Sequence, residues 1–391
     1  MEREVYGIKN YHIENKMKVL HIASFNGNIG DNAHHNGFRR NFSKIVNEKI
    51  EWQNLEIRNF YKSWNKMKFD EKFIEKTNHY DLIIIGGGNF FEICHEYSST
   101  GTTIDISLDI LKQIKPKIFF NALGFDINKG YSEETKSKFK IFLDFLLENS
   151  DKYFVTFRND GSKKNYEKLY GSLPKNLYIV PDGGFFLKDL VKREQKTKTK
   201  YLGINLACDM LDKRLKNITY EEFCKKLGEI FLKFIGKNKG YKLLFFPHIY
   251  SDYKIILDIL KNFSDINIKY NVEIAPYFTG QNSEKEFFNF YEKCDLLTGM
   301  RFHTNVCGIA LNIPTIGIKT YQKLEDVYFE IGLEERCLDV NKNNFFEKYL
   351  EELQNTLLNQ KEIKEEYKKV KNKLILAKNE KYKILKEWLI K

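Results

Sequence analysis

Short apolar runs alternate with amphipathic segments along most of this chain. The runs at 17–24 (MKVLHIAS), 80–88 (YDLIIIGGG) and 117–126 (KIFFNALGFD) are short and almost continuously apolar, which is typical of strands buried on both faces. Segments with apolar residues at helical spacing lie between such runs. This alternation predicts parallel α/β sheets.

The pattern divides into two groups of elements. In the first group, strands are predicted at 17–24, 52–57, 80–88, 117–126, 153–160 and 176–184, and helices at about 34–49 and 132–149, with Ser132 as an N-cap. In the second group, strands are predicted at 201–207, 241–249, about 271–278 and 313–318, and helices at 220–235, 253–263, 283–297 and 303–311. A last long helix repeats apolar residues every three or four positions, so one stripe of it is expected to dock. That stripe consists of Ile363, Tyr367, Val370, Leu374 and Ala377.

A charged run at 188–200 (KDLVKREQKTKTK) separates the two groups and marks the predicted junction between two α/β domains. No repeat of short fixed period and no Pro-rich or Gly/Ser-rich tract is present. The predicted organisation is an N-terminal extension (1–16), an N-terminal Rossmann-like domain (17–190), a C-terminal Rossmann-like domain (201–340) and a C-terminal basic helical extension (341–391).

The positive charge of the chain is concentrated near its C-terminal end. The formal net charge is +11, and residues 361–391 contribute +6 of it, with 11 Lys and 5 Glu. The body is therefore only mildly basic. It carries no zinc-finger, RRM or helix-turn-helix signature, so we expect no nucleic-acid partner. The basic tail is either a solvated helix face or a contact with an anionic membrane surface or an acidic glycan.

Cysteine spacing and the lengths of the apolar runs indicate the cellular compartment of the protein. None of the six cysteines belongs to a CxxC pair, which argues against a zinc ribbon and suits a reducing environment. Residues 1–18 lack the apolar core of a signal peptide, and no apolar run approaches the length of a membrane span. We expect a cytoplasmic protein, with the inner face of the membrane as an alternative location.

The loop after the first strand (FNGNIGDNAHH) offers Asn28, Gly30 and Asp31 as site residues. Ligands of doubly wound sheets bind beyond the carboxyl ends of strands, glycine permits close approach of the backbone, and a helix N-terminus favours an anion. Asp31 either caps the helix, hydrogen-bonds a sugar hydroxyl or positions a base. The glycine spacing matches neither GxGxxG nor a P-loop, so neither site is indicated.

The strand at 80–88 ends in three consecutive glycines, which Asn89 and Glu92 follow. Each glycine costs about 0.5–1 kcal/mol relative to alanine in regular structure, so three together predict close approach of a ligand or of another chain segment. We therefore expect Gly87 and Gly88, together with Asn89 and Glu92, to line a cleft.

Basic residues follow several of the later strands. Arg158 ends one of them, where a guanidinium either clamps a phosphate or carboxylate or forms a surface ion pair. In the second half, an Arg-x-His pair precedes a helix, and an imidazole in that position can transfer protons near neutral pH. The candidates there are His248, Arg301, His303, Lys319 and Lys323. No metal-ligand spacing is visible, so we expect no metal.

Six motifs, in this order, resemble those of the polysaccharide pyruvyltransferase family: GNIGDNA, DLIIIGGGNFFE, NALGFD, VTFRNDGS, PDGG and GMRFHTNVCGIALNIPTIGI with a following YQK. The resemblance covers about residues 17–335, and the GMRFH block is its most specific part. It implies an α/β fold like that of the GT-B glycosyltransferases, with two Rossmann-like domains facing a cleft and a C-terminal helical extension.

The resemblance also implies a reaction and a set of site residues. Pyruvate would pass from phosphoenolpyruvate, without a cofactor, to two hydroxyls of a sugar in a surface polysaccharide or its precursor, giving a ketal and phosphate. The family's anion-binding arginines fall on Arg158 and Arg301, and its active-site histidine falls on His303. We thus predict His303 and Asp31 as catalytic residues. Donor binding is assigned to Arg158, Arg301 and Lys319, and cleft-lining or acceptor contacts to Asn28, Gly30, Gly87, Gly88, Asn89, Glu92, His248 and Lys323.

Two other functions are compatible with the sequence. A glycosyltransferase that uses a nucleotide sugar can have the same fold, because fold alone does not determine chemistry. A non-catalytic module that binds a glycan or another partner could have kept the cleft. The expected partners of the enzyme are phosphoenolpyruvate and a saccharide acceptor, free or lipid-linked, with the C-terminal helix as a candidate membrane contact.

Overall fold

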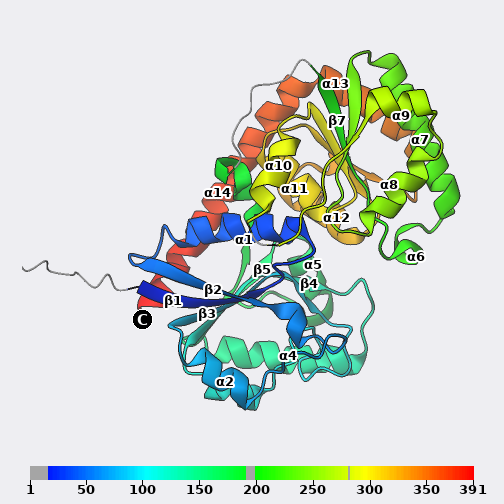
Figure 1. Cartoon of the computed structure of the whole chain (residues 1–391). Helices are drawn as coiled ribbons and strands as arrows, with labels where there is room; N and C mark the ends of the chain where they lie inside the picture. Colours follow the sequence, from blue (N-terminus) through cyan, green and yellow to red (C-terminus); the bar gives the residue numbers. More distant parts are fainter. Residues whose placement is uncertain (1–15, 191–198, 281) are drawn as a thin grey trace, which may run out of the picture.

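The computed structural model describes residues 16–190, 199–280 and 282–391 of the chain. In this part of the chain two six-stranded parallel sheets, each packed against helices, form two lobes (Figure 1). The predicted α/β class with two Rossmann-like units is confirmed. The predicted N-terminal extension and most of the predicted junction lie outside the described residues, so these boundaries stay predictions.

The first lobe contains a sheet of spatial order β2-β1-β3-β4-β5-β6, in which all neighbouring strands are parallel. Its strands are β1 (Lys16–Ala23), β2 (Lys49–Glu56), β3 (Leu82–Glu92), β4 (Lys117–Asp126), β5 (Tyr153–Arg158) and β6 (Leu177–Val180). Its helices are α1 (Ile29–Phe42), η1 (Ile57–Phe60), α2 (Glu71–Thr77), α3 (Leu108–Gln113), α4 (Glu133–Glu148), α5 (Ser162–Tyr170) and η2 (Gly183–Leu190).

The second lobe contains a sheet of spatial order β12-β11-β10-β7-β8-β9, again with parallel neighbours. Its strands are β7 (Lys200–Asn205), β8 (Tyr241–Phe245), β9 (Val272–Ile274), β10 (Leu296–Gly299), β11 (Thr315–Lys319) and β12 (Cys337–Asp339). Its helices are α6 (Leu211–Arg214), α7 (Tyr220–Lys237), α8 (Asp252–Leu260), α9 (Asp265–Asn271), α10 (Glu284–Tyr291), α11 (Phe302–Ala310), α12 (Gln322–Ile331), η3 (Glu334–Arg336) and α13 (Phe345–Leu358).

Local chemistry explains where the best-predicted elements begin. The first four residues of β3, from Leu82 to Ile85, are at most 1% exposed, as expected for a parallel strand with both faces covered. Helix α4 begins after Ser132, whose hydroxyl accepts a hydrogen bond from the Thr135 amide while the Thr135 side chain accepts one from the Ser132 amide. This reciprocal capping confirms Ser132 as the N-cap.

Helix α14 (Gln360–Ile390) joins the two lobes, and Figure 1 shows it running along both of them. Ile363, Tyr367 and Val370 pack with residues of α11 and α12 in the second lobe. Tyr382, Leu385 and Trp388 instead pack in the first lobe. The two halves of one helix therefore hold the lobes in one arrangement.

Several predicted elements differ from the structure. Helix α1 begins at Ile29 rather than near residue 34, and β12 was not predicted. The segment predicted as a basic extension consists of α13, which packs into the core of the second lobe, and α14. Ala377 is exposed and Lys378 is buried in its place, because the helix turns its contact face as it passes between the lobes.

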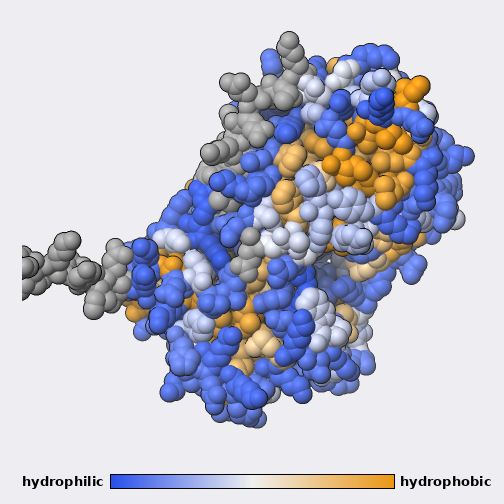
Figure 2. All heavy atoms as spheres, in the orientation of Figure 1, coloured by the Kyte–Doolittle hydropathy of each residue, from blue (hydrophilic) through white to orange (hydrophobic). Residues whose placement is uncertain are grey.

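The surface is mostly hydrophilic on the face drawn in Figure 2, with an apolar area over the second lobe near α8 and α9. Exposed apolar side chains of these two helices include Leu257, Ile266 and Ile268. Among the described residues, no helix is both long enough and apolar enough to cross a membrane.

Candidate active site

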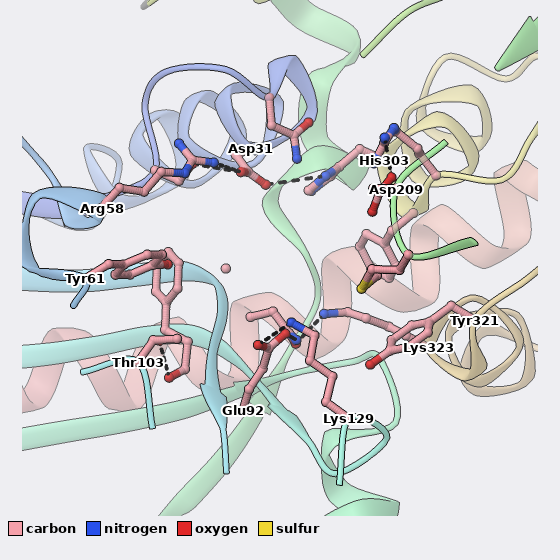
Figure 3. A pocket seen from close by; sticks show the side chains of 18 of the residues that line it. Asp31, Arg58, Tyr61, Glu92, Thr103, Lys129, Asp209, His303, Tyr321 and Lys323 are labelled. Atoms are coloured by element: carbon pink, nitrogen blue, oxygen red, sulfur yellow. Dashed lines mark hydrogen bonds and ion pairs between the residues drawn. The ribbon is translucent and has the colours of Figure 1, made fainter. Parts of the chain in front are cut away.

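A cavity of about 840 Å³ lies between the lobes (Figure 3), and loops that follow strands of both sheets form its walls. Strand order reverses between β1 and β3 in the first sheet and between β7 and β10 in the second. Such switch points are where doubly wound sheets bind ligands. Asn28 and Glu92 line the cavity at the first switch point, and Asp209 and Arg301 line it at the second.

His303 extends from the second lobe toward two carboxylates of the first lobe. It lies in the first turn of α11 and is 6% exposed. Its Nδ1 is 3.8 Å from Asp31 Oδ1, a contact drawn as a dashed line in Figure 3, and its Nε2 is 3.5 Å from Asp182 Oδ2. A Cβ atom on Gly30 would lie 2.5 Å from His303 Cβ, so a side chain there would displace the ring. The imidazole is thus placed between two carboxylates of the first lobe.

Asp182 is a fully buried carboxylate at the site, with 0% exposure. Its Oδ2 accepts a hydrogen bond from Arg158 Nη1 at 3.0 Å and lies 3.0 Å from His34 Nδ1, while its Oδ1 accepts one from the Gly184 amide at 2.7 Å. Burial alone would raise the pKa of Asp182, but His34 and His303 hold that pKa well below its usual value. Asp182 therefore stays ionised next to His303.

Arg158 lines the cavity but is already paired with carboxylates. Its Nε donates to Asp160 Oδ2 at 2.8 Å, and its guanidinium lies over the Phe302 ring, 4.8 Å from the centroid. Burial opposes the charge, yet Asp160 and Asp182 raise the pKa of Arg158 above its usual value. Arg158 Nη2 makes no hydrogen bond to any described residue. One side of the guanidinium therefore remains for a ligand.

Arg301, the N-cap residue of α11, is paired with carboxylates as Arg158 is. Its Nε donates to Asp252 Oδ2 at 2.8 Å, and its Nη2 donates to Asp209 Oδ1 at 2.7 Å. Arg214 Nη2 lies 3.1 Å from the other oxygen of Asp209. Burial would raise the pKa of Asp209, but Arg301 and Arg214 lower it below its usual value. This pairing fixes the Arg301 side chain against the second lobe.

Two of the lysines that line the cavity are paired with carboxylates of the first lobe. Lys323 extends from α12 to the first lobe, where its Nζ lies 2.8 Å from Asp160 Oδ2 and donates to Asn89 Oδ1 at 2.6 Å. Burial and the neighbouring guanidinium lower the pKa of Lys323 below its usual value. Lys129 Nζ lies 2.6 Å from Glu92 Oε2, and although burial opposes its charge, this carboxylate raises the pKa of Lys129.

Aromatic side chains form part of the wall on both lobes, including Tyr61 and Tyr321 (Figure 3). The Tyr321 hydroxyl donates to Asp126 Oδ2 at 2.9 Å. Burial raises the pKa of both phenols, so each keeps its proton. Rings with an apolar face and a polar tip suit the faces and hydroxyls of a sugar.

Ten predicted site residues line this one cavity. They are Asn28, Asp31, Gly88, Asn89, Glu92, Arg158, His248, Arg301, His303 and Lys323. Asp31 is not the cap of α1: the cap is Asn28, whose Oδ1 accepts a hydrogen bond from the Gly30 amide at 3.1 Å. The Asp31 carboxylate is therefore available to Ser24, whose hydroxyl donates to it at 3.0 Å, and to the cavity.

His248 also lines the cavity, but its contacts indicate a structural role. Its Nε2 lies 2.6 Å from the Tyr291 hydroxyl and 3.2 Å from Thr304 Oγ1. Burial, assisted by the charge of Arg301, lowers the pKa of His248 well below its usual value. The ring is therefore neutral and helps to pack α11 against α10.

Three predicted site residues do not line the cavity. Lys319 Nζ is bound to Glu325 at 2.8 Å and to Asp339 at 3.0 Å, outside the described lining of the cavity, and its assignment to donor binding stays a prediction. Gly30 and Gly87 lie behind the wall, where a side chain on either would collide with a histidine, His303 for Gly30 and His34 for Gly87. Both glycines accommodate a neighbouring chain segment rather than a ligand.

The prediction from sequence missed several residues of the walls. They include Arg58, Tyr61, Lys129, Asp209, Arg214 and Tyr321. Arg58 and Tyr61 follow β2, and Asp209 follows β7, so the strand-end rule applied to these two strands would have found them. Tyr321 stands in the YQK motif, two positions before Lys323.

One group of potential metal ligands lies at the edge of the cavity. Donor atoms of Glu92, Cys94 and His95 lie within 4.8 Å of one another. The Glu92 carboxylate already holds the Lys129 ammonium, and burial raises the pKa of the Cys94 thiol, which disfavours the thiolate that a metal would need. These contacts favour the lysine over a metal at this position, and the expectation of no metal stays a prediction.

Solved structures with a similar fold include a UDP-GlcNAc 2-epimerase and a glycosyltransferase. MnaA of S. aureus, solved with UDP, has a TM-score of 0.53 at 11% identity, with 90% of each chain covered. UDP-GlcNAc 2-epimerase from Neisseria meningitidis, bound to UDP-GlcNAc, has a TM-score of 0.53 at 13% identity, covering 90% of this chain and 94% of that one. A glycosyltransferase from Rickettsia africae has a TM-score of 0.52 at 11% identity, covering 96% and 99%. These likenesses establish the GT-B-like fold that the sequence predicted.

Sequence comparison identifies the family. No curated protein matches the chain. The family model for polysaccharide pyruvyl transferase matches residues 28–320, a span that contains all of the cavity-lining residues except Ser24, Tyr321, Lys323 and Leu324. Members of this family are transferases that act in pyruvate transfer onto polysaccharide. The chain belongs to the polysaccharide pyruvyl transferase family.

Proposed function

We propose that this enzyme transfers pyruvate from phosphoenolpyruvate to two hydroxyls of one sugar residue, forming a cyclic ketal and releasing phosphate. The observation that carries the proposal is the position of His303 between Asp31 and Asp182, in a cavity whose walls also hold Arg158, Arg301 and other cations. A proton donor and a set of anion-binding groups are the two requirements of this reaction.

The donor is a compact anion with a carboxylate and a phosphate. The groups that would receive it are the open side of Arg158, the ammonium of Lys323 and the N-terminus of α11, which begins at Phe302 beside the cavity. Lys323 spans the lobes, so an anion bound to it contacts both of them. Arg301, fixed by Asp252 and Asp209, would position the start of α11 in addition to contributing charge.

In the first step, one sugar hydroxyl attacks C2 of phosphoenolpyruvate while C3 takes up a proton and becomes a methyl group. A new C2–O bond forms, and the carbon–carbon double bond becomes single. We assign the supply of this proton to His303, which lies between the carboxylates of Asp31 and Asp182. Asp31 or Glu92 takes the proton that the hydroxyl loses. General acid–base assistance of this kind contributes about 10²–10⁴-fold.

In the second step, the bond between C2 and the phosphate oxygen breaks, and the second hydroxyl forms the other C2–O bond. The proton of that hydroxyl leaves with the phosphate after transfer through a cavity carboxylate or His303. Overall, of the two hydroxyl protons, one ends on the methyl carbon and the other on phosphate, so the reaction needs no oxidant or reductant.

The acceptor would lie against the aromatic wall formed by Tyr61 and Tyr321. A volume of about 840 Å³ is within the usual range of about 300–1,000 Å³ for ligand cavities and leaves room for a sugar beside the donor. The structure is equally compatible with a free or a lipid-linked saccharide at this wall.

Thermal shift with phosphoenolpyruvate and with UDP separates this proposal from the nucleotide-sugar glycosyltransferase that shares the fold. A ligand at 100 times its Kd stabilises the folded protein by about 2.7 kcal/mol. We expect stabilisation by phosphoenolpyruvate, and a smaller response in Arg158→Lys, because lysine cannot hold both carboxylates and still present a donor. Stabilisation by UDP with no response to phosphoenolpyruvate would overturn the proposal.

A further inference from the structure

A second hollow, of about 580 Å³, lies along α14 and shares no lining residue with the active-site cavity. We call it the α14 groove. Its floor includes Phe185, Phe186 and Leu374. Its cationic side chains are Arg40, Lys44, Lys368, Lys371 and Lys378. No Asp or Glu is among the described residues that line it. Lys368 pairs with Glu365, which lies outside the lining on the same helix, and the described lining carries a net positive charge.

Lys378 is the most enclosed of these cations and is 8% exposed. Its Nζ donates to Asn41 Oδ1 at 2.5 Å and lies 4.9 Å from the centroid of the Phe186 ring. Both partners are neutral, and no ion pair of Lys378 with a described carboxylate is formed. Burial and the charge of Lys44 lower the pKa of Lys378. The buried charge is thus not compensated within the groove, and an anion placed there would offset it.

Exposed apolar side chains lie next to these cations. In α14, Ile375 is 41% exposed and Leu376 is 69% exposed, between Lys371 and Lys378 in the sequence. Water is a poor environment for both side chains, and a small soluble anion would not cover them. A bilayer surface would satisfy both features, because its phosphates pair with lysines while its acyl region receives the apolar side chains.

We propose that the α14 groove binds the surface of an anionic phospholipid bilayer, with lipid phosphates in the groove and Ile375 and Leu376 in the interfacial layer. The charge of the groove identifies the sign of the partner, and the adjoining apolar residues distinguish a bilayer from nucleic acid or a soluble anion. This inference does not depend on the proposed reaction, because it uses a different surface. It gives the basic C-terminal helix a defined contact.

Vesicle sedimentation tests the proposal with the full chain. The protein is expected to sediment with phosphatidylcholine vesicles that contain phosphatidylglycerol, not with phosphatidylcholine alone, and to dissociate at high salt. Each basic residue near an anionic surface strengthens binding by about fivefold, so Lys44→Glu/Lys371→Glu is expected to weaken it by at least about 25-fold. Ile375→Ser/Leu376→Ser is expected to weaken binding by a similar factor at each salt concentration where wild type still binds, since it removes only the apolar contribution, which salt does not screen.

Lys225→Glu/Lys233→Glu is the matched control, because both lysines are exposed on α7 in the second lobe and the change in net charge is the same. Equal binding by wild type and the groove variant, or equal losses in the groove and control variants, would overturn the proposal. So would displacement of the protein from anionic vesicles by inorganic phosphate at matched ionic strength, which would assign the groove to a small anion.

Discussion

The active-site cavity and the α14 groove are both basic, but their cations have different partners. In the cavity, Arg158, Arg301 and Lys323 each contact at least one carboxylate. In the groove, Lys378 contacts an amide and an aromatic ring. Carboxylate pairing fixes a cation in one direction, which chemistry at one atom requires. The cations that line the groove together supply a field, which suits a surface that needs no single orientation.

The largest expected effect comes from changing His303, which lies among the paired charges of the cavity. His303→Gln is expected to lower kcat by about 10²–10⁴-fold, because the proton donor at C3 is lost, while the melting temperature changes little. Phosphate release from phosphoenolpyruvate plus acceptor measures it. His79→Gln, at an exposed position, is the control and should leave kcat unchanged. Wild-type turnover in His303→Gln would remove the histidine from the chemistry.

Asp182→Asn tests the pairing directly. Removing this charge leaves the buried Arg158 with one carboxylate fewer, and breaking a buried pair costs about 3–5 kcal/mol. Urea unfolding should show the loss, whereas Asp212→Asn, at an exposed position, should change the free energy of unfolding by less than about 0.5 kcal/mol. A loss as small as that of the control would show that Asp182 does not hold the cluster together.

The same carboxylate predicts an acid dependence. The folded-state pKa of Asp182 lies well below its usual value, so its contribution to stability is complete above the unfolded-state pKa of about 3.9 and is lost as pH falls through the folded-state value. Wild type should therefore lose more stability on acidification below about pH 4 than Asp182→Asn does. Parallel losses in the two proteins would contradict the assignment.

Gly30→Ala tests how closely the lobes approach at His303. The added methyl would meet the imidazole, so we expect a cost of about 1–3 kcal/mol together with a lower kcat. Gly236→Ala is the matched control: apart from the local helix backbone, no heavy atom of the described residues lies within 4 Å of the position its Cβ would take, and this variant should be stabilised by about 0.5–1 kcal/mol. Unchanged kcat in Gly30→Ala would mean that the ring has freedom to move aside.

The smallest effect is expected in the groove. Folding lowers the pKa of Lys378 from 10.5, so the unfolded chain binds that proton more tightly and the charge destabilises the folded state at neutral pH. Lys378→Met should therefore change the free energy of unfolding by less than about 1 kcal/mol, unlike Asp182→Asn. As pH rises to about 10.5, the free energy of unfolding of wild type should increase relative to that of Lys378→Met, because the penalty on the wild-type charge disappears. Lys383→Met, exposed on the same helix, should show no such shift.

The sequence predicted the sheets better than the contacts between distant elements. The apolar run at 117–126 has the bounds of β4, because a strand buried on both faces must be apolar throughout. Strand β12 has three residues, all of intermediate exposure, and leaves no comparable run. The predicted apolar stripe on α14 was wrong at Ala377, since no single spacing of apolar residues describes a helix that docks on one lobe and then on the other.

The position of a residue at the end of a strand helped to predict which residues line the cavity, but its charge alone did not. Arg158 and His303 come from different lobes, and the rule that ligands bind beyond strand ends brought both to one cavity. Lys319 also ends a strand, yet Glu325 and Asp339 bind it outside the walls. Which cations pair with buried carboxylates depends on the fold as a whole, so the compensation of Arg158 by Asp182 could not be predicted from the sequence.

The central claim is that the cavity moves pyruvate from phosphoenolpyruvate to a saccharide through His303. Mass spectrometry of a saccharide pool, after incubation with carbon-labelled phosphoenolpyruvate, tests it most directly. We expect a labelled pyruvate ketal on one saccharide with the wild-type enzyme and almost none with His303→Gln. A pool that stays unlabelled with wild type, but gains a glycosyl group from a UDP-sugar, would contradict the account.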